Sequence, residues 1–334
     1  FITYDGIHHT AKKWNIGAYL YSENDIKNQP LQQNLSEDQV QILKQAGDDS
    51  SLMQGPSAYE DSYSENKILY QKNIINGQEV FEYSNDATQT LYQVKFSYVG
   101  ANAGRYNLLS NQAIGKIYEF VGDNLGDYNP TTQLIAPTKL QIATVVGAYK
   151  KKKKTNINTE IAVSNNDLNL YSDIDDENNK GLAIKFEGDK VLHQAKNTLS
   201  AFATFDYVEQ NFKTVERLYN IEFTRDWNID ELILDANQKR ITAGLKYQLN
   251  QLGSITYQFD HLNLAGNFKG YKQSLFANLK SKKIELTQNL NYLTTSGNNT
   301  SSNFLRNYST LKYSKDKNWV GFKLNAEDKK QKDK

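Results

Sequence analysis

Few side chains in this sequence combine the type and spacing that enzyme chemistry requires. The four histidines, His8, His9, His193 and His261, are scattered, and the adjacent pair would point to opposite faces of a strand, which is wrong for joint metal binding. The absence of cysteine removes disulfide frameworks, zinc clusters and thiol catalysis. A nucleophile elbow, a dinucleotide-binding glycine motif and a P-loop are also absent. We therefore expect a non-enzymatic protein with no catalytic, cofactor-binding or metal-binding residues.

The densest acidic cluster, residues 173–177, contains Asp173, Asp175, Asp176 and Glu177. Calcium takes several carboxylate and carbonyl oxygens from one flexible loop, so a Ca²⁺ site is one interpretation. The cluster lacks the Asp-x-Asp-x-Asp-Gly spacing with a terminal Glu, and a solvated extracellular loop explains the same residues. We favour the solvated loop.

Five consecutive lysines, Lys150–Lys154, form the densest basic run. Such a run could meet anionic lipid head groups or polyanions. At the end of a hairpin that crosses a membrane, the run would more simply be a charged turn that keeps the strand ends out of the hydrocarbon layer. We favour that interpretation. Lys and Arg total 39 against 38 Asp and Glu, a net charge of +1. Because nucleic-acid binding needs a basic face, we expect no nucleic-acid partner.

The elements that position these residues show the two-residue period of β-strands. In 219–230, Tyr219, Ile221, Phe223, Arg225, Trp227 and Ile229 alternate with polar residues, which predicts a strand. Arg225 is the single charge on that apolar face. If the strand crosses a membrane, an arginine facing lipid would cost roughly 2–4 kcal/mol at the midplane, so we expect Arg225 near a membrane boundary. The same alternation recurs in further segments: Leu140–Ala148, Leu199–Tyr207, Ile241–Leu249, Ile255–Phe259, Ile284–Tyr292 and Val320–Leu324.

Strand length and composition favour a transmembrane β-barrel over a soluble β-sandwich. The alternating segments suggest strands of about 10–12 residues, longer than the usual 5–6 and matched to the roughly 9–11 that cross a bilayer. Hydrophobic residues make up 38% of the chain, and the mean hydropathy is −0.70. A barrel with apolar residues toward lipid and polar residues inside keeps both values low. Trp14, Trp227 and Trp319 lie near expected strand ends, as in the aromatic girdles of such barrels.

Connection lengths in the last third of the chain point the same way. We expect tight turns at 250–253, 280–283 and 315–318, with long loops at 263–270 and 295–303, and barrels have short turns at one rim and longer loops at the other. Counted from Lys150, however, the alternation places 231–238 on the tight side and 250–253 on the long side. Either a strand near 181–198 is miscounted, or loop length is a weak guide in this part of the chain.

The first 137 residues differ from the rest, since all four prolines lie within them. We expect a leading strand region at 1–22 and a β-rich extramembrane insertion at 23–137. One short helix within it should begin with a Ser36–Gln39 capping box and stop at Gly47. Asn76-Gly77 should form a type I′ hairpin turn. Residues 138–334 supply the barrel strands, for about 10–12 antiparallel strands overall.

Four segments resemble a family of large, poorly characterised outer-membrane β-barrel proteins of Bacteroidota. They are Tyr21–Gln32, Ala162–Asn169, Val208–Phe212 and Tyr219–Asn228. The likeness covers most of the chain and implies an outer-membrane location and a segment from the middle of a longer protein. It implies no catalytic or binding residue.

We therefore expect an all-β, antiparallel transmembrane barrel segment, with strands outside the sequence closing the barrel. The chain starts at Phe1 and ends in a charged run, which also suggests an internal piece with its export signal elsewhere. The expected function is non-enzymatic: transport, secretion or surface assembly in the cell outer membrane, without cofactors. The expected partners are the lipid bilayer and proteins at the cell surface or periplasmic rim. A secreted or surface-attached module that binds glycan or protein is the alternative, and an enzyme is a third.

Overall fold

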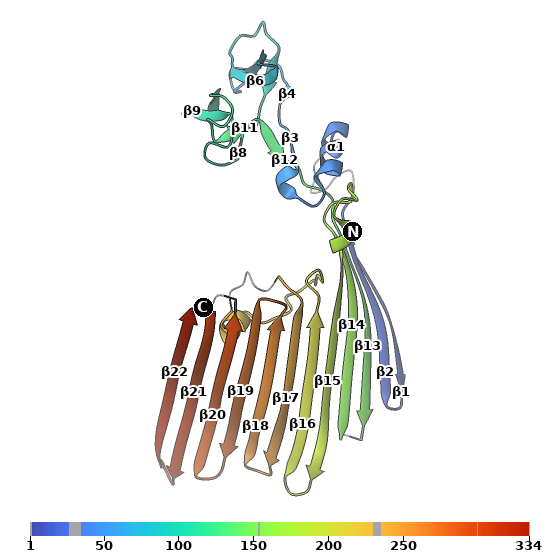
Figure 1. Ribbon diagram of the computed structural model, residues 1–334, viewed down its shortest axis with the longest axis vertical. Coiled ribbons are helices and arrows are strands. Elements are labelled where there is room, and N and C mark those ends of the chain that lie inside the picture. Colours follow the sequence, from blue (N-terminus) through green and yellow to red (C-terminus); the bar gives the residue numbers. More distant parts are fainter. Residues whose placement is uncertain (1, 27–34, 153, 230–234, 299, 334) are drawn as a thin grey trace. The chain divides into compact units, whose positions relative to one another are not determined.

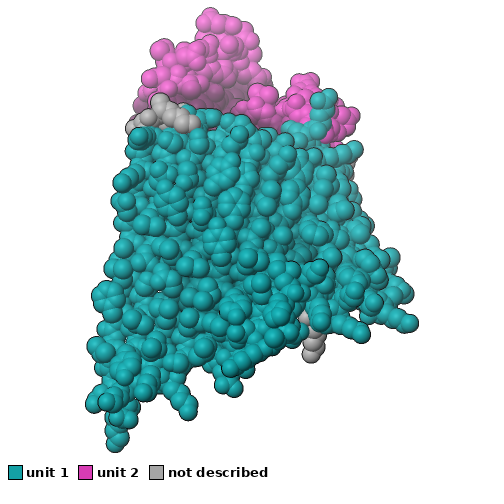
Figure 2. Space-filling model, turned by 60° about the horizontal axis from the view of Figure 1, so that its bottom comes forward, with its two compact units in different colours: residues 1–24, 139–166, 177–334 teal, residues 25–138, 167–176 magenta. Residues whose placement is uncertain are grey.

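The computed structural model describes residues 2–26, 35–152, 154–229, 235–298 and 300–333. The chain forms two compact units, which are coloured separately in Figure 2. Unit 1 comprises residues 1–24, 139–166 and 177–334, and unit 2 comprises 25–138 and 167–176. The expected boundaries lay at 22/23 and 137/138, and the short return segment 167–176 had not been assigned to the insertion.

In its described residues, unit 1 is built on one antiparallel sheet of twelve strands, so the all-β prediction is confirmed (Figure 1). The first two strands are followed, after unit 2, by ten strands that pair in sequence order. Within the described residues β1 and β22 are the two edges, and no pairing closes the sheet between them. The strands are β1 (Ile2–Ala11), β2 (Trp14–Asn24), β13 (Lys139–Lys151), β14 (Thr155–Asp167), β15 (Lys180–Gln194), β16 (Thr198–Val208), β17 (Gln238–Leu249), β18 (Gly253–Leu264), β19 (Phe268–Lys280), β20 (Ile284–Gly297), β21 (Thr300–Lys315) and β22 (Asn318–Asp333).

Connections at one rim of this sheet all have two or three residues: 12–13, 152–154, 195–197, 250–252, 281–283 and 316–317. The long connections, 25–138, 168–179 and 209–237, all lie at the opposite rim. At that rim, however, the connections 265–267 and 298–299 are also short. The expected long loops at 263–270 and 295–303 are therefore wrong, because the flanking strands extend almost until they meet.

The predicted strand over 219–230 is also wrong. Phe223–Trp227 is a short helix, α2, within the long connection 209–237. Asn228 ends this helix in the left-handed conformation, one that asparagine tolerates better than most residues. Asp230 lies outside the described residues. Without this strand, 209–237 is a single long connection and 250–252 falls at the rim of short turns, so the conflict in the expected alternation disappears. The strands β15 and β16 form one hairpin, so no strand near 181–198 was miscounted.

The described part of unit 2 contains one α-helix and three small sheets. The helix α1 (Glu37–Ala46) has the predicted capping box: the Ser36 hydroxyl accepts a hydrogen bond from the Gln39 backbone, and the Gln39 side chain accepts one from the Ser36 backbone. The Asn76-Gly77 turn between β5 and β6 is confirmed, with φ values of 52° and 79°. The remaining elements are η2 (Ser50–Leu52), β3 (Gln54–Pro56), β4 (Tyr59–Glu60), β5 (Tyr70–Ile75), β6 (Gln78–Tyr83), β7 (Leu91–Gln93), β8 (Ser97–Tyr98), β9 (Tyr106–Gln112), β10 (Gly115–Phe120), β11 (Tyr128–Asn129) and β12 (Thr131–Gln133), while η3 (Asp176–Asn178) crosses the boundary between the units.

Within unit 2 an eight-residue pattern occurs twice, and the two copies pair with each other. Residues 99–106 and 121–128 share the pattern Val-Gly-x-Asn-x-Gly-x-Tyr. The central glycines, Gly104 and Gly126, form an isolated antiparallel bridge with reciprocal backbone hydrogen bonds of 2.7 and 3.1 Å. A Cβ on Gly126 would lie 2.4 Å from the backbone nitrogen of Tyr106, so these two segments can approach only because the position carries no side chain.

The apolar core of unit 2 is of the kind found in water-soluble domains. Tyr106 and Val80 are fully buried, and Tyr70 is 1% exposed. The buried phenols are also hydrogen-bonded: the Phe81 backbone N–H donates to the Tyr106 hydroxyl at 2.8 Å, and the Tyr118 backbone N–H donates to the Tyr70 hydroxyl at 3.1 Å. Burial raises the pKa of Tyr70 to about 12 and also raises the pKa of Tyr106.

Candidate functional site

The two faces of the large sheet carry different chemistry. Strand register aligns apolar residues of five strands, which form the row Ala201, Leu245, Tyr257, Leu275 and Leu290. Leu245 and Tyr257 are 47% and 45% exposed. We call this side the apolar face. Because side chains alternate along a strand, the neighbouring residues lie on the opposite side, which we call the polar face.

The strand β13 departs from this separation. Its apolar series Leu140–Ala148 was expected on the apolar face, and this expectation is wrong for Ile142. Ile142 packs with Ala162, Val208 and Phe212 in a buried cluster on the polar face. Phe212 belongs to the long connection 209–237, so the apolar series in β13 helps to hold that connection against the sheet.

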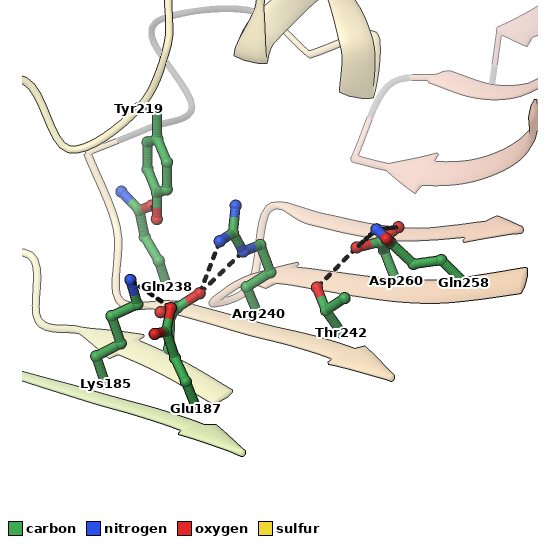
Figure 3. A network of polar contacts seen from close by, with 9 residues as sticks. Lys185, Glu187, Tyr219, Gln238, Arg240, Thr242, Gln258 and Asp260 are labelled. Carbon is green, nitrogen blue, oxygen red and sulfur yellow. Dashed lines mark hydrogen bonds and ion pairs between the residues drawn. The ribbon is translucent and has the colours of Figure 1, made fainter. Parts of the chain in front are cut away.

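The polar face carries a network of paired side chains across β15–β18 (Figure 3). Two guanidinium nitrogens of Arg240, Nε and Nη2, both lie 2.9 Å from the Asp206 carboxylate on the neighbouring strand. Further along, Thr242 donates a hydrogen bond of 2.7 Å to the buried Asp260. Gln258 donates to both oxygens of the same carboxylate at 2.9 and 2.8 Å.

The connection 209–237 covers one end of the polar face. Its side chains Phe223 and Trp227 are buried against Leu262, Leu264 and neighbouring strand residues. Two glycines permit the close approach. A Cβ on Gly270 would lie 2.9 Å from the Trp227 ring, and one on Gly181 would lie 2.2 Å from the Phe212 backbone nitrogen. The large sheet therefore has its protein-covered core on the polar side.

Charged residues of α2 also contact this face. Arg306 of β21 donates to the Asp226 carboxylate at 3.0 Å and to the Arg225 carbonyl at 2.9 Å. Arg225 itself pairs with Glu222 at 2.9 Å, and its side chain is 71% exposed. The expected place of Arg225, on an apolar strand face, is therefore wrong. Trp227, expected in an aromatic girdle at a strand end, is 3% exposed in the covered core.

Beneath α2 the polar face encloses a cavity of about 280 Å³. Its lining includes Arg225, Asp226, Lys272 and Arg306, so cationic side chains outnumber anionic ones. The Lys272 ammonium lies 4.6 Å from the centre of the Trp227 ring. The Arg306 guanidinium lies 4.1 Å from the Phe304 ring centre. Sequence reasoning missed this site because the side chains come from α2 and β18–β21, and no local motif joins them.

The acidic cluster at 173–177 lies beside Asp48 and Asp167. Burial, followed by the charges of Asp167, Asp175 and Asp176, raises the pKa of Asp48. A group of three or more His, Cys, Asp or Glu side chains arranged to hold a metal ion is not found among the described residues. The Ca²⁺ interpretation therefore gains no support from side-chain geometry.

The other sequence candidates remain apart from one another. His8 and His9 occupy successive positions of β1, His193 lies at a register shift in β15, and His261 stacks on Tyr271 in β18–β19. The lysine run Lys150–Lys154 spans the end of β13 and the following turn, with Lys153 outside the described residues.

The apolar face is interrupted by polar residues near one edge of the sheet. On β20 and β21, Gln288 donates to Asn307 at 2.6 Å and accepts from Ser309 at 2.7 Å. Along β22, Val320, Phe322 and Leu324 give way to charged residues from Glu327 onward. The apolar surface is therefore most continuous over the middle strands.

Neither a protein-family model nor a curated protein matches this chain. In the described part of the chain, no helix has the length and apolar character to cross a membrane.

Proposed function

We propose that this chain is a non-enzymatic outer-membrane β-barrel protein whose large sheet forms part of the barrel wall. Its apolar face would contact acyl chains, and its polar face would line the interior. The observation that carries this proposal is the side on which the sheet is covered. The connection 209–237 buries the polar side, whereas Leu245 and Tyr257 on the apolar side are about half exposed. A soluble sheet would bury the apolar face instead.

The spacing of aromatic residues on the apolar face supports the same proposal. Trp14 and Tyr149, 4.6 Å apart between ring centres, lie near the rim of short turns, as does Tyr247. Toward the other rim lies Tyr207, which pairs with Lys239, eight positions from Tyr247 on β17. Eight residues span about 27 Å along a strand, before any tilt. This is similar to the roughly 25 Å apolar band between the aromatic girdles of outer-membrane barrels.

Strand lengths and connections fit the same proposal. The sheet strands have 10–16 residues, enough for a tilted strand to cross a bilayer. Uniformly short turns at one rim and all long connections at the other are typical of outer-membrane barrels, with the short turns on the periplasmic side. The segments that resemble Bacteroidota outer-membrane proteins favour the same compartment.

The polar face would be the working surface, and transport, secretion or surface assembly would be its role. Several of its charged side chains pair with one another, as Arg240 does with Asp206 and Arg306 with Asp226. Such pairs suit the wall of a water-filled or plugged interior. Lipid of the outer membrane would be the main partner, with further protein partners at the surface or the periplasmic rim.

Cell fractionation and heat-modifiable gel mobility test this proposal. We expect the protein in the outer-membrane fraction, detergent-dependent solubility, and a mobility that changes when the sample is boiled. Conductance steps in a planar bilayer would further support a transport role. A folded monomer that stays soluble without detergent would contradict the proposal and favour a secreted or surface-attached binding module.

A further inference from the structure

The cavity beneath α2 contains cationic groups that lack partners for part of their hydrogen-bonding capacity. Lys272 is partly buried, and among the described residues no carboxylate lies within 4.0 Å of its ammonium group. The Arg306 Nε atom is buried without a hydrogen-bond partner, although both terminal nitrogens of the same guanidinium are bonded. A buried cationic donor left without an acceptor is costly, so an anionic group that supplies acceptors here would be stabilised.

The rest of the lining is suited to neutral hydroxyl groups and a carbon skeleton. Ser274, Asn289 and Asn291 supply hydroxyl and amide groups from adjacent strands. Ser274 donates to Asn291 at 2.7 Å, and Asn291 donates to Asn289 at 2.6 Å, so these side chains are already oriented. Phe276 and Phe304 add aromatic surface to the same lining.

The size of the cavity limits the ligand. About 280 Å³ lies just below the roughly 300–1,000 Å³ typical of sites for drug-sized molecules. A small molecule of monosaccharide size is the appropriate class. Arg225 and Arg306 are already paired with Glu222 and Asp226, so Lys272 is the lining cation that favours an anionic ligand.

We propose that this cavity binds a small hydroxylated carboxylate of the acidic-sugar class. Its carboxylate would pair with the Lys272 ammonium, and its hydroxyl groups would contact the amides of β20. A carboxylate matches these donors because charge-assisted hydrogen bonds are the strongest that such side chains form. This inference goes beyond the proposed function and does not depend on it, since the cavity lies on the polar face whatever contacts the apolar face.

Titration calorimetry on the whole chain in detergent micelles tests the proposal, with glucuronate, glucose and inorganic phosphate as probes. We expect glucuronate to bind and glucose to bind at least about tenfold more weakly, because the neutral sugar cannot pair with the cations. Glucuronate affinity should also fall as salt is raised. These comparisons use the unmodified chain and need no variant to fold.

Lys272→Met should weaken glucuronate binding about tenfold or more while retaining the packing volume against Trp227. Lys246→Met is the matched control. Lys246 lies on β17, is exposed on the same polar face of the sheet as Lys272, and is outside the cavity lining. Its removal should leave glucuronate affinity unchanged. Equal loss in both variants would overturn the proposed site. Equal binding of glucose, tighter binding of phosphate than of glucuronate, or no binding of any probe would overturn the proposed ligand class. None of these outcomes bears on the membrane location of the sheet.

Discussion

The large sheet and unit 2 use the same apolar residue types in opposite ways. In unit 2, Tyr70, Val80 and Tyr106 are at most 1% exposed, and each lies against other parts of the protein. In the sheet, Leu245 and Tyr257 face outward and are 47% and 45% exposed. Large contiguous apolar surfaces are unusual on water-soluble monomers. Unit 2 therefore buries these apolar side chains within itself, whereas those of the sheet's apolar face stay exposed and, under the proposed function, would be covered by lipid.

The largest expected effect tests whether the sheet has a protein-built core on its polar face. Trp227→Ala should lower the free energy of unfolding of the detergent-solubilised chain by about 3–5 kcal/mol, since it empties a site packed against Leu262 and Gly270. Denaturant titration measures the change. Trp319→Ala is the control, because Trp319 is 67% exposed, and it should cost well under half as much. If both variants lost the same free energy of unfolding, the packing of Trp227 on the polar face would not be a main source of the sheet's stability.

A second change tests the self-paired repeat of unit 2. Gly126→Ala should cost about 3 kcal/mol, because the added Cβ would meet the Tyr106 backbone and separate the two repeat segments. Gly77→Ala should cost only about 1 kcal/mol, since its Cβ would have nothing within 4 Å and only its φ of 79° is unfavourable. Hydrogen exchange of residues 99–128 localises the effect. Similar protection in both variants would contradict the proposed need for close approach.

A third change tests the surroundings of the apolar face. Leu245→Lys should cost roughly 2–4 kcal/mol in a bilayer, because the proposed function places this side chain against lipid. Thr256→Lys places the same charge on the polar face of the adjacent strand and should cost far less. Folding equilibria of both variants in lipid vesicles provide the measurement. A larger loss for Thr256→Lys would reverse the assignment of the two faces.

The smallest effect concerns pH and only unit 2. The pKa of Tyr70 is raised by burial from 10.0 to about 12. The folded phenol therefore stays protonated where the unfolded one ionises, and its stabilising contribution is lost as pH rises from about 10 to 12. Two pKa units correspond to about 2–3 kcal/mol. Alkaline unfolding followed by near-ultraviolet circular dichroism tests this expectation. Tyr70→Phe should reduce the pH dependence, at the cost of the hydrogen bond from the Tyr118 backbone. An unchanged alkaline transition in that variant would contradict the assignment.

Much of the sheet was predictable because strand periodicity is local. The apolar series Leu199–Tyr207, Ile241–Leu249 and Ile284–Tyr292 all lie on one face, as their alternation implied. The total of twelve strands in the large sheet also lies within the expected 10–12.

Alternation misled where long-range packing decides the structure. Tyr219–Asp230 has the clearest period of two, yet Phe223 and Trp227 are four residues apart and lie together in the covered core through α2. The cavity residues Lys272 and Arg306 could not be associated from sequence, since only strand register and α2 bring them together. The repeat at 99–106 and 121–128 carried a readable signal in its identical spacing, which was missed.

Site-directed spin labelling along β17 tests the central claim most directly, and the absence of cysteine allows single labels without background. Nitroxides at Ala243→Cys and Leu245→Cys would be compared with Thr242→Cys and Lys246→Cys in chains reconstituted into lipid vesicles. We predict high accessibility to oxygen and low accessibility to a water-soluble nickel chelate at positions 243 and 245, with the reverse at 242 and 246. Equal access of the nickel chelate to all four positions would contradict the claim that the apolar face meets lipid.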